Sequence, residues 1–412
     1  MIVNRIHSLA LHYYRGIWKN VSFLILLGSS ICYFFVNYVL KINLKGEDYG
    51  DFSLILVLLN VSSSFCFLGS DQLLMRSCKI DDGSITVERG VIILMVTCFV
   101  TYTIISSYLF KKYYFADANL YELIIINLLM GSLTFQYTIF RVLRFFEHAQ
   151  IQKNGWKILF FIISLLIVLI YGTINIPTLL VTLIVVFIIS MLFGIRKAGT
   201  IKFNLVEGAV SYRLWLNFSL SMLIMNLLNS FDKFLIEYKL SRADLGDYFF
   251  LQNIFLSPFS QIQTYAGFKL LALYKLRYKR NDLAKENRKY LRYGFLLTFL
   301  ITLVFFIYNS FFYQLISVNQ QTVIFILLFV ITGIVRVLYA NISAAMGAVG
   351  TSKMLFKSNF LFLIISLLVS LPLFVVSGTL NAIILLIGLL WIIRYTTALT
   401  CLNGGDPKFR SV

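Results

Sequence analysis

Long apolar runs separated by short polar segments make up most of the chain. A helix needs about 20 apolar residues to cross roughly 30 Å of hydrocarbon, at a rise of about 1.5 Å per residue. The pattern therefore predicts an all-α polytopic membrane protein with twelve transmembrane helices. Their expected limits are 19–40, 52–75, 90–110, 121–146, 156–173, 178–195, 213–238, 248–272, 292–313, 322–345, 355–376 and 379–400.

Two short patterns occur twice, about half a chain length apart. Phe140-Arg141-Val142-Leu143 returns as Val335-Arg336-Val337-Leu338, and Asp48-Tyr49-Gly50-Asp51 returns as Asp244-Leu245-Gly246-Asp247. The shared offset of 195 to 196 residues predicts an internal duplication.

The duplication divides the chain into an N-terminal lobe, 1–206, and a C-terminal lobe, 207–412, each with six predicted helices. Because six is an even number, both lobes have the same orientation in the membrane. They are expected to be parallel repeats related by a pseudo-two-fold axis along the membrane normal. Duplicated bundles of this kind are most often transporters that bind their substrate between the repeats.

The distribution of lysine and arginine predicts the orientation, because positively charged loops stay cytoplasmic. With the amino terminus inside, 26 of the 36 basic residues, among them Lys153, Lys157 and Arg394, lie in inside segments, six in outside segments and four within spans. Both termini are therefore expected in the cytoplasm.

The most basic inside segment, Lys275 to Arg292, is explained as a topology determinant, or alternatively as a site for lipids or a protein partner. The basic head, Met1–Lys19, is not followed by a small-residue cleavage site, so the first apolar run is expected to be retained.

Composition agrees with a membrane protein. Hydrophobic residues make up 59% of the chain and charged residues 13%, whereas about a quarter of a soluble domain is charged. A net charge of +18 in a soluble protein would suggest nucleic acid, but here the charge lies in the loops, so no nucleic-acid partner is expected. Five cysteines, mostly in apolar runs, and three scattered histidines predict neither disulfides nor a metal site. The chain has no phosphate-binding glycine loop or nucleophile elbow, so neither a cofactor nor an enzymatic function is expected.

Arg141 and Arg336 are the strongest candidates for binding. Each interrupts an apolar run, where a charge costs roughly 2.5 to 3.5 kcal/mol at the bilayer centre. Their side chains either reach the inner interface or face equivalent walls of a central cavity, and the matched positions favour the cavity. A guanidinium group can pair with two phosphate oxygens at once, which a lysine cannot do.

Four other charged residues are expected within spans. Lys233 and Lys269 are the remaining intramembrane cations, and Lys269 lies close enough to the inner face to reach it. Asp71 and Asp232 are candidates for a protonation switch that couples transport to an ion gradient, or alternatively for structural pairing with Arg141, Lys269 or Lys233. Because adjacent helical residues point about 100° apart, Lys233 and Asp232 are not expected to form a good pair.

Two prolines are candidate hinges for alternating access. Pro258 in the eighth span and Pro372 in the eleventh would each remove a backbone hydrogen bond and bend the helix. Polar stripes on the second and seventh spans are expected either to face a cavity or to join helices to one another.

The residues that open the second and eighth helices resemble those of a known family. A first helix leading into Gly46-Glu47-Asp48-Tyr49-Gly50-Asp51-Phe52, and Asp232-Lys233-Phe234 followed by Asp244-Leu245-Gly246-Asp247-Tyr248, are similar to the pattern of the polysaccharide transporters. These are the Wzx-type O-antigen flippases, which belong to the MOP superfamily together with the MATE multidrug exporters and the lipid II flippase. The resemblance covers nearly the whole chain in length, span count and motif order.

The resemblance implies a MATE-like fold of two six-helix lobes in the bacterial inner membrane. It also implies that the protein moves an undecaprenyl diphosphate-linked oligosaccharide from the cytoplasmic to the periplasmic leaflet, among membrane lipids and alongside a polysaccharide polymerase and a chain-length regulator. Arg141, Lys269 and Arg336 are the positions that would line the family's cationic lumen.

Two other functions fit the sequence less well. A MATE-type drug antiporter shares the architecture but commonly has a more acidic lumen, whereas cations outnumber acids in these spans. A membrane glycosyltransferase or polysaccharide polymerase would usually carry a sizeable outer loop with catalytic residues, and the outer loops here are short.

Overall fold

The computed structural model describes residues 21–44, 46–81, 84–115, 119–199, 201–208, 210–276, 278, 281–311, 320–376 and 379–403. The basic head Met1–Lys19 and the tail with Lys408 and Arg410 lie outside the described residues, so the placement of both termini stays a prediction. The helices are α2 (Val21–Asn43), α3 (Gly46–Phe65), α4 (Ser70–Ser77), α5 (Arg89–Tyr113), α6 (Leu120–Val142), α7 (Phe146–Tyr171), α8 (Ile176–Ala198), α9 (Tyr212–Lys239), α10 (Arg242–Phe255), α11 (Ser257–Leu276), α12 (Asp282–Phe311), α13 (Gln320–Val349), α14 (Ser352–Val376) and α15 (Leu380–Asn403).

The chain is a multi-pass membrane protein with a predominantly helical fold, as the apolar runs predicted. In the described part of the chain, 11 helices are long and apolar enough to cross a membrane. The expected span at 248–272 is instead divided between α10 and α11, which are separated at Leu256. The count of twelve spans is therefore not confirmed.

A second break interrupts the span expected at 52–75. Helix α3 ends at Phe65 and α4 begins at Ser70, because Leu68 and Gly69 both have positive φ angles, 46° and 77°. The carbonyl oxygen of Leu68 accepts hydrogen bonds from α9, at 3.0 Å from Trp215 Nε1 and also from the hydroxyl of Ser219. The break turns the start of α4, with Asp71, toward the interior of the bundle.

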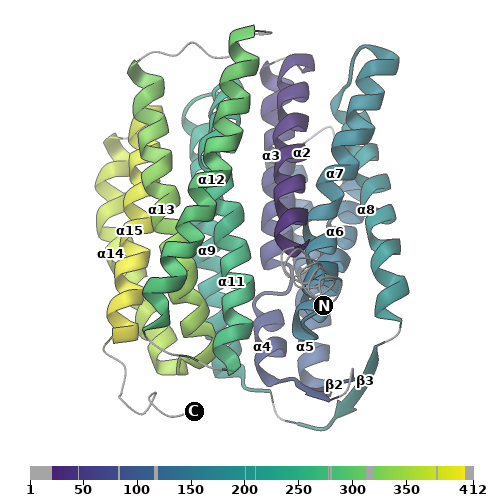
Figure 1. Cartoon of the computed structure of the whole chain (residues 1–412), viewed down its shortest axis with the longest axis vertical. Coiled ribbons are helices and arrows are strands. Elements are labelled where there is room, and N and C mark those ends of the chain that lie inside the picture. Colours follow the sequence, from purple (N-terminus) through teal and green to yellow (C-terminus); the bar gives the residue numbers. More distant parts are fainter. Residues whose placement is uncertain are drawn as a thin grey trace, which may run out of the picture.

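A small sheet was not predicted. Strands β1 (Lys79–Asp81) and β2 (Ser84–Glu88) are antiparallel, and β3 (Lys202–Val206) pairs in parallel with β2, with Ser84 opposite Lys202. The sheet joins the loop after α4 to the linker between α8 and α9. We call the end of the bundle that carries it the sheet face and the opposite end the far face (Figure 1).

The helices form a bundle in which α6, α7 and α8 lie to one side and α13, α14 and α15 to the other, with α2, α3, α9, α11 and α12 between them (Figure 1). Helix α2 packs on α7, α6 packs on α7 and α8, and α11 and α15 pack on α13. Large exposed apolar side chains, including Leu169, Phe193, Phe299 and Leu368, lie on the outer helices, where they suit contact with lipid. The expected division at 206/207 and the two-fold symmetry stay predictions.

The two halves meet at the far face through the repeated glycine-acid motifs. Helix α10 packs across α3, and Gly50 lies against the backbone of Arg242 so closely that a Cβ atom would be 2.9 Å from the carbonyl carbon of that residue. The acids of the two motifs pair reciprocally. Arg242 lies 2.6 Å from Asp51, and Lys41 lies 2.5 Å from Asp247. The motifs therefore hold the far face closed in this structure.

Candidate functional site

A polar cavity lies between the first-half and second-half helices. It has two compartments, of about 220 Å³ and about 290 Å³, that share lining residues such as Ser63, Lys153 and Arg336 and therefore lie next to each other. The smaller, central compartment lies beneath the α3–α10 crossing. The larger, sheet-side compartment is lined by Asp71 of α4, Arg141 near the end of α6 and residues near the α13–α14 turn.

The polar side chains of α3 and α9 include residues that face the cavity and residues that join helices to one another. Ser63, Ser64, Asn226 and Asn229 line the cavity. Ser62, in contrast, donates a hydrogen bond to Asn127 at 2.5 Å and so joins α3 to α6.

The lining is strongly cationic. Among the described residues, six lining side chains carry a positive charge and one, Asp71, carries a carboxylate. Charged groups removed from water are costly unless they are paired. The excess of positive charge therefore favours an anionic ligand. The six cations are Arg141, Lys153, Lys157, Lys233, Arg336 and Arg394.

Arg336 lies in the wall where the two compartments meet. Its side chain is 8% exposed, its Nε donates to Gln263 at 2.8 Å, and its Nη2 donates to Asn229 at 2.6 Å. Its guanidinium carbon lies 4.7 Å from the centre of the Trp391 ring, a favourable cation–π distance. Neutral groups thus orient Arg336 without neutralising its charge.

Arg141, the matching residue of the first half, lines the sheet-side compartment. Its Nη2 donates to the carbonyl oxygen of Gly267 at 3.1 Å, and its guanidinium carbon lies 5.5 Å from the ring of Phe268. Both contacts are to α11 of the second half. Arg141 and Arg336 therefore line one cavity, as the duplicated pattern suggested, and Arg141 faces the interior rather than lipid.

Arg394 is a third arginine of the cavity, and its placement corrects the sequence analysis, in which it was counted with the cytoplasmic segments. It lies within α15 and is 3% exposed. Its Nε donates to Tyr339 at 3.0 Å and its Nη2 to Asn359 at 2.9 Å, while Nη1 has no hydrogen-bond partner. In the sequence, Arg394 lies near the end of the last expected span and precedes the basic C-terminal tail, so nothing indicated that its side chain points inward.

Lys153 and Lys157 were also counted with a cytoplasmic loop, but they are the eighth and twelfth residues of α7, which begins at Phe146. Lys157 donates to Asn154 at 3.0 Å and lies 5.2 Å from the ring of Tyr33. Lys153 lies 4.6 Å from the ring of Tyr137. Their spacing of four residues, which places both on one helical face, was the available signal.

Lys233 and Asp232 form a pair, contrary to the expectation from helical geometry. The Nζ of Lys233 lies 3.0 and 2.9 Å from the two carboxylate oxygens of Asp232. The flexible four-carbon stem of lysine folds back along the helix, so the angle between adjacent residues does not prevent contact. Asp232 also accepts from Tyr248 at 2.5 Å and from Gln252 at 2.8 Å. The pairing favours a structural role for Asp232.

Asp71 borders the sheet-side compartment and accepts a hydrogen bond from Gln72 at 3.0 Å. None of the described cations lies within 4.0 Å of its carboxylate, so the expected structural pairing is absent in this part of the chain. A coupling role for Asp71 stays a prediction.

Lys269 is not among the residues that line either compartment. It lies 4.8 Å from the ring of Tyr265 on its own helix. The placement favours the alternative in which this lysine reaches the interface.

The prolines differ in their surroundings. Pro258 is the second residue of α11, following the break at Leu256, so it does not interrupt a continuous helix as expected. Pro372 lies inside α14 and is exposed. Their role as hinges stays a prediction.

Comparison with known proteins identifies the fold. No protein-family model matches the chain, and no curated protein sequence matches it. A solved structure of the lipid II flippase MurJ, in an inward closed conformation, superposes with a TM-score of 0.58 over 95% of this chain and 88% of that chain, at 13% sequence identity. At this identity the similarity establishes a shared fold.

Proposed function

We propose that the protein is a flippase that carries an undecaprenyl diphosphate-linked oligosaccharide, of the O-antigen repeat-unit type, from the cytoplasmic to the periplasmic leaflet of a bacterial inner membrane. The observation that carries the proposal is a cavity with arginines from both halves of the chain, inside a fold shared with a lipid II flippase.

The diphosphate is the part of such a lipid that the cavity suits best. Arg141, Arg336 and Arg394 all line the sheet-side compartment. Each is held by carbonyl, amide or hydroxyl groups, and none has a carboxylate within 4.0 Å among the described residues. Hydrogen bonds to charged groups are worth about 1.5 to 3 kcal/mol each. The free Nη1 of Arg394 offers one such bond without breaking an existing one.

The sheet face is the expected entrance. Besides the hydrogen bonds from Trp215 and Ser219 to Leu68, its contacts between the two halves include two single donations to backbone carbonyls. Arg76 donates to Gly350 at 3.0 Å, and Lys275 donates to Met75 at 2.6 Å. The far face is closed by the reciprocal ion pairs and the α3–α10 packing. We expect these two donations to break more readily than the closure at the far face, so the proposal includes a first opening toward the sheet face, which the basic loops predict to be cytoplasmic.

Entry of the lipid requires the cavity to widen. Each compartment is smaller than the 300 to 1,000 Å³ of a typical ligand pocket, so a diphosphate with attached sugars would need the halves to separate. In this proposal the prenyl tail stays in lipid, the sugars enter the central compartment, and the helices then rock to open the far face. A polysaccharide polymerase and a chain-length regulator would act on the product.

The residues that line the cavity also argue against the two alternative functions. A MATE-type antiporter for cationic drugs would require a cavity that attracts cations, whereas this lining has one carboxylate among the described residues. A glycosyltransferase or polymerase would require catalytic groups beside a sugar, and the described lining of the central compartment, where the sugars would lie, supplies amides, hydroxyls and cationic side chains.

Complementation of a flippase-null strain tests the proposal. We expect the double variant R141A/R336A to lose surface polysaccharide and to accumulate unflipped lipid-linked oligosaccharide in the inner leaflet, while K353Q, at an exposed lysine of α14, behaves as wild type. Normal surface polysaccharide in the double variant, at normal protein abundance, would refute the role of the arginines.

A further inference from the structure

We infer that the saccharide carried by this protein is acidic, and that Lys153 and Lys157 bind its carboxylate in the central compartment. The inference rests on the proposed function, because it names the class of sugar that the same cavity would take.

The two lysines lack the partners that a structural role would give them. Neither has a carboxylate within 4.0 Å among the described residues, and their charges lie one helical turn apart on α7. Like charges at this spacing repel each other, and charge within a membrane-spanning bundle is costly. Aromatic rings and the amide of Asn154 surround the ammonium groups and orient them. A bound anion would offset both costs.

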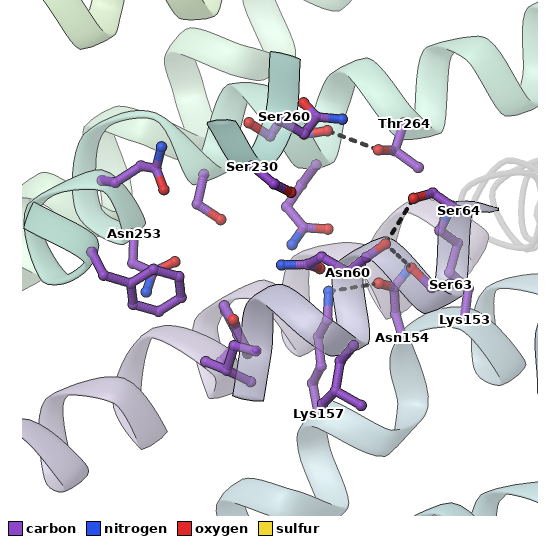
Figure 2. Close-up of a pocket in the computed structure, with 18 of the residues that line it drawn as sticks. Asn60, Ser63, Ser64, Lys153, Asn154, Lys157, Ser230, Asn253, Ser260 and Thr264 are labelled. Atoms are coloured by element: carbon purple, nitrogen blue, oxygen red, sulfur yellow. Dashed lines mark hydrogen bonds between the residues drawn. The ribbon is translucent and has the colours of Figure 1, made fainter. Parts of the chain in front are cut away.

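The surroundings of Lys157 are those of a sugar site. Asn60, Asn154 and Asn253 line the central compartment together with serine and threonine hydroxyls, and the aromatic rings of Tyr33 and Trp156 contribute apolar faces. Amides and hydroxyls both donate and accept, as sugar hydroxyls do. Figure 2 shows Lys157 and Asn154 on one wall beside Asn60, with Ser230, Asn253 and Ser260 on the facing elements.

Amides and hydroxyls alone would suit a neutral sugar, so the lysines are the feature that calls for an acid. The described lining of the central compartment contains no carboxylate. Lys233, its third lysine, is already neutralised by Asp232. The unpaired positive charge of this compartment therefore lies on Lys153, Lys157 and Arg336.

The diphosphate does not account for these lysines. Arg141 and Arg394 line only the sheet-side compartment, whereas Lys157 lines only the central one. Lys153 lies between the two compartments. Because α7 runs from the sheet face toward the far face, Lys157 is about 6 Å farther along it than Lys153. A ligand that spans both compartments would thus present its diphosphate to the arginines and a more distant group to Lys157.

Binding measurements on the full chain in lipid nanodiscs test the inference with three probes. These are trigalacturonate, the same trisaccharide with its carboxyl groups reduced to alcohols, and inorganic pyrophosphate. We expect wild type to bind trigalacturonate about tenfold more tightly than the reduced trisaccharide, as one charge-assisted contact would produce. The K153Q/K157Q variant should lose the preference and keep its affinity for pyrophosphate, whereas R394Q should weaken pyrophosphate alone.

Two controls separate binding from folding. K153R/K157R keeps the charges and should keep the preference, and K353Q should change nothing. Equal affinity of wild type for the two trisaccharides would overturn the inference. Loss of pyrophosphate affinity in K153Q/K157Q would also overturn it, since the lysines would then belong to the diphosphate site. Failure of wild type to bind pyrophosphate, with the acidic preference intact, would count against the proposed function instead.

Discussion

Replacing Gly50 with alanine tests how the far face closes. Gly50 lies in α3 where α10 crosses it, and its α-carbon faces the backbone of Arg242. An added Cβ would overlap the carbonyl oxygen of Arg242 and lie 2.9 Å from the carbonyl carbon. Backbone atoms of a helix start cannot rotate away as a side chain can, so α3 and α10 would have to separate.

The size of the effect follows from the cost of overpacking. An extra methyl group in a close-packed contact typically costs about 1 to 3 kcal/mol. If the cost falls only on the state in which α3 and α10 are in contact, it shifts the equilibrium toward the state open at the far face by a factor of roughly 5 to 150. A minor conformation would then become readily measurable.

Distances between spin labels at Glu47 and Asp244 report the separation directly, because both residues are exposed at the starts of α3 and α10. The labels would be introduced into a chain whose five native cysteines are replaced. We expect a longer distance to gain population in G50A. Gly46→Ala is the matched control, since its Cβ would lie 3.7 Å from the Cβ of Ala243, an ordinary contact.

The reasoning fails if G50A and G46A give the same distance distribution at the same thermal stability. It also fails if G50A shifts the population toward the shorter distance. A uniform loss of stability without a longer distance would mean that the clash is absorbed inside the helices rather than at the far face.

Two further predictions concern the stability of the bundle. Lys233→Met leaves the 1%-exposed Asp232 without its ammonium partner, so we expect a loss of about 3 to 5 kcal/mol, partly restored in D232N/K233M, in unfolding experiments in detergent. A loss as large in the double variant would contradict the pairing. Gly333→Ala would place a Cβ 2.5 Å from the ring of Phe259 between α13 and α11, so we expect a loss of about 1 to 3 kcal/mol. Gly28→Ala, with nothing within 4 Å, should differ little from wild type in the same experiment.

Much of the fold could be predicted from the sequence because membrane-spanning helices must satisfy their own backbone hydrogen bonds. Apolar runs therefore mark them directly. The breaks at Leu68–Gly69 and at Leu256 were missed, since the first depends on hydrogen bonds that α9 donates to Leu68 from more than a hundred residues away. The sheet was missed because its strands are short and pair across distant loops.

The candidate site was predicted only in part. Arg141 and Arg336 were found because they interrupt apolar runs at matching positions. Arg394, Lys153 and Lys157 were missed because the sequence analysis assigned them to cytoplasmic segments, whereas α7 begins before both lysines and α15 continues to Asn403. Their direction depends on neighbours from other helices, such as Tyr339 and Asn359 beside Arg394.

The parallel pairing of β2 with β3 limits how the second half of the chain can move. Strand β3 ends at Val206 and α9 begins at Tyr212, so only a few residues separate a strand fastened to the first half from the first helix of the second. Gly208 lies against the side chain of Glu88, and Val210 lies against Gly90. These contacts restrict the movement of the segment between β3 and α9. A displacement of α9 is thus expected to be small at this corner, so an opening of the sheet face would depend on movement of α11 and of the α13–α14 turn, whose contacts with the first half include the single donations between Lys275 and Met75 and between Arg76 and Gly350.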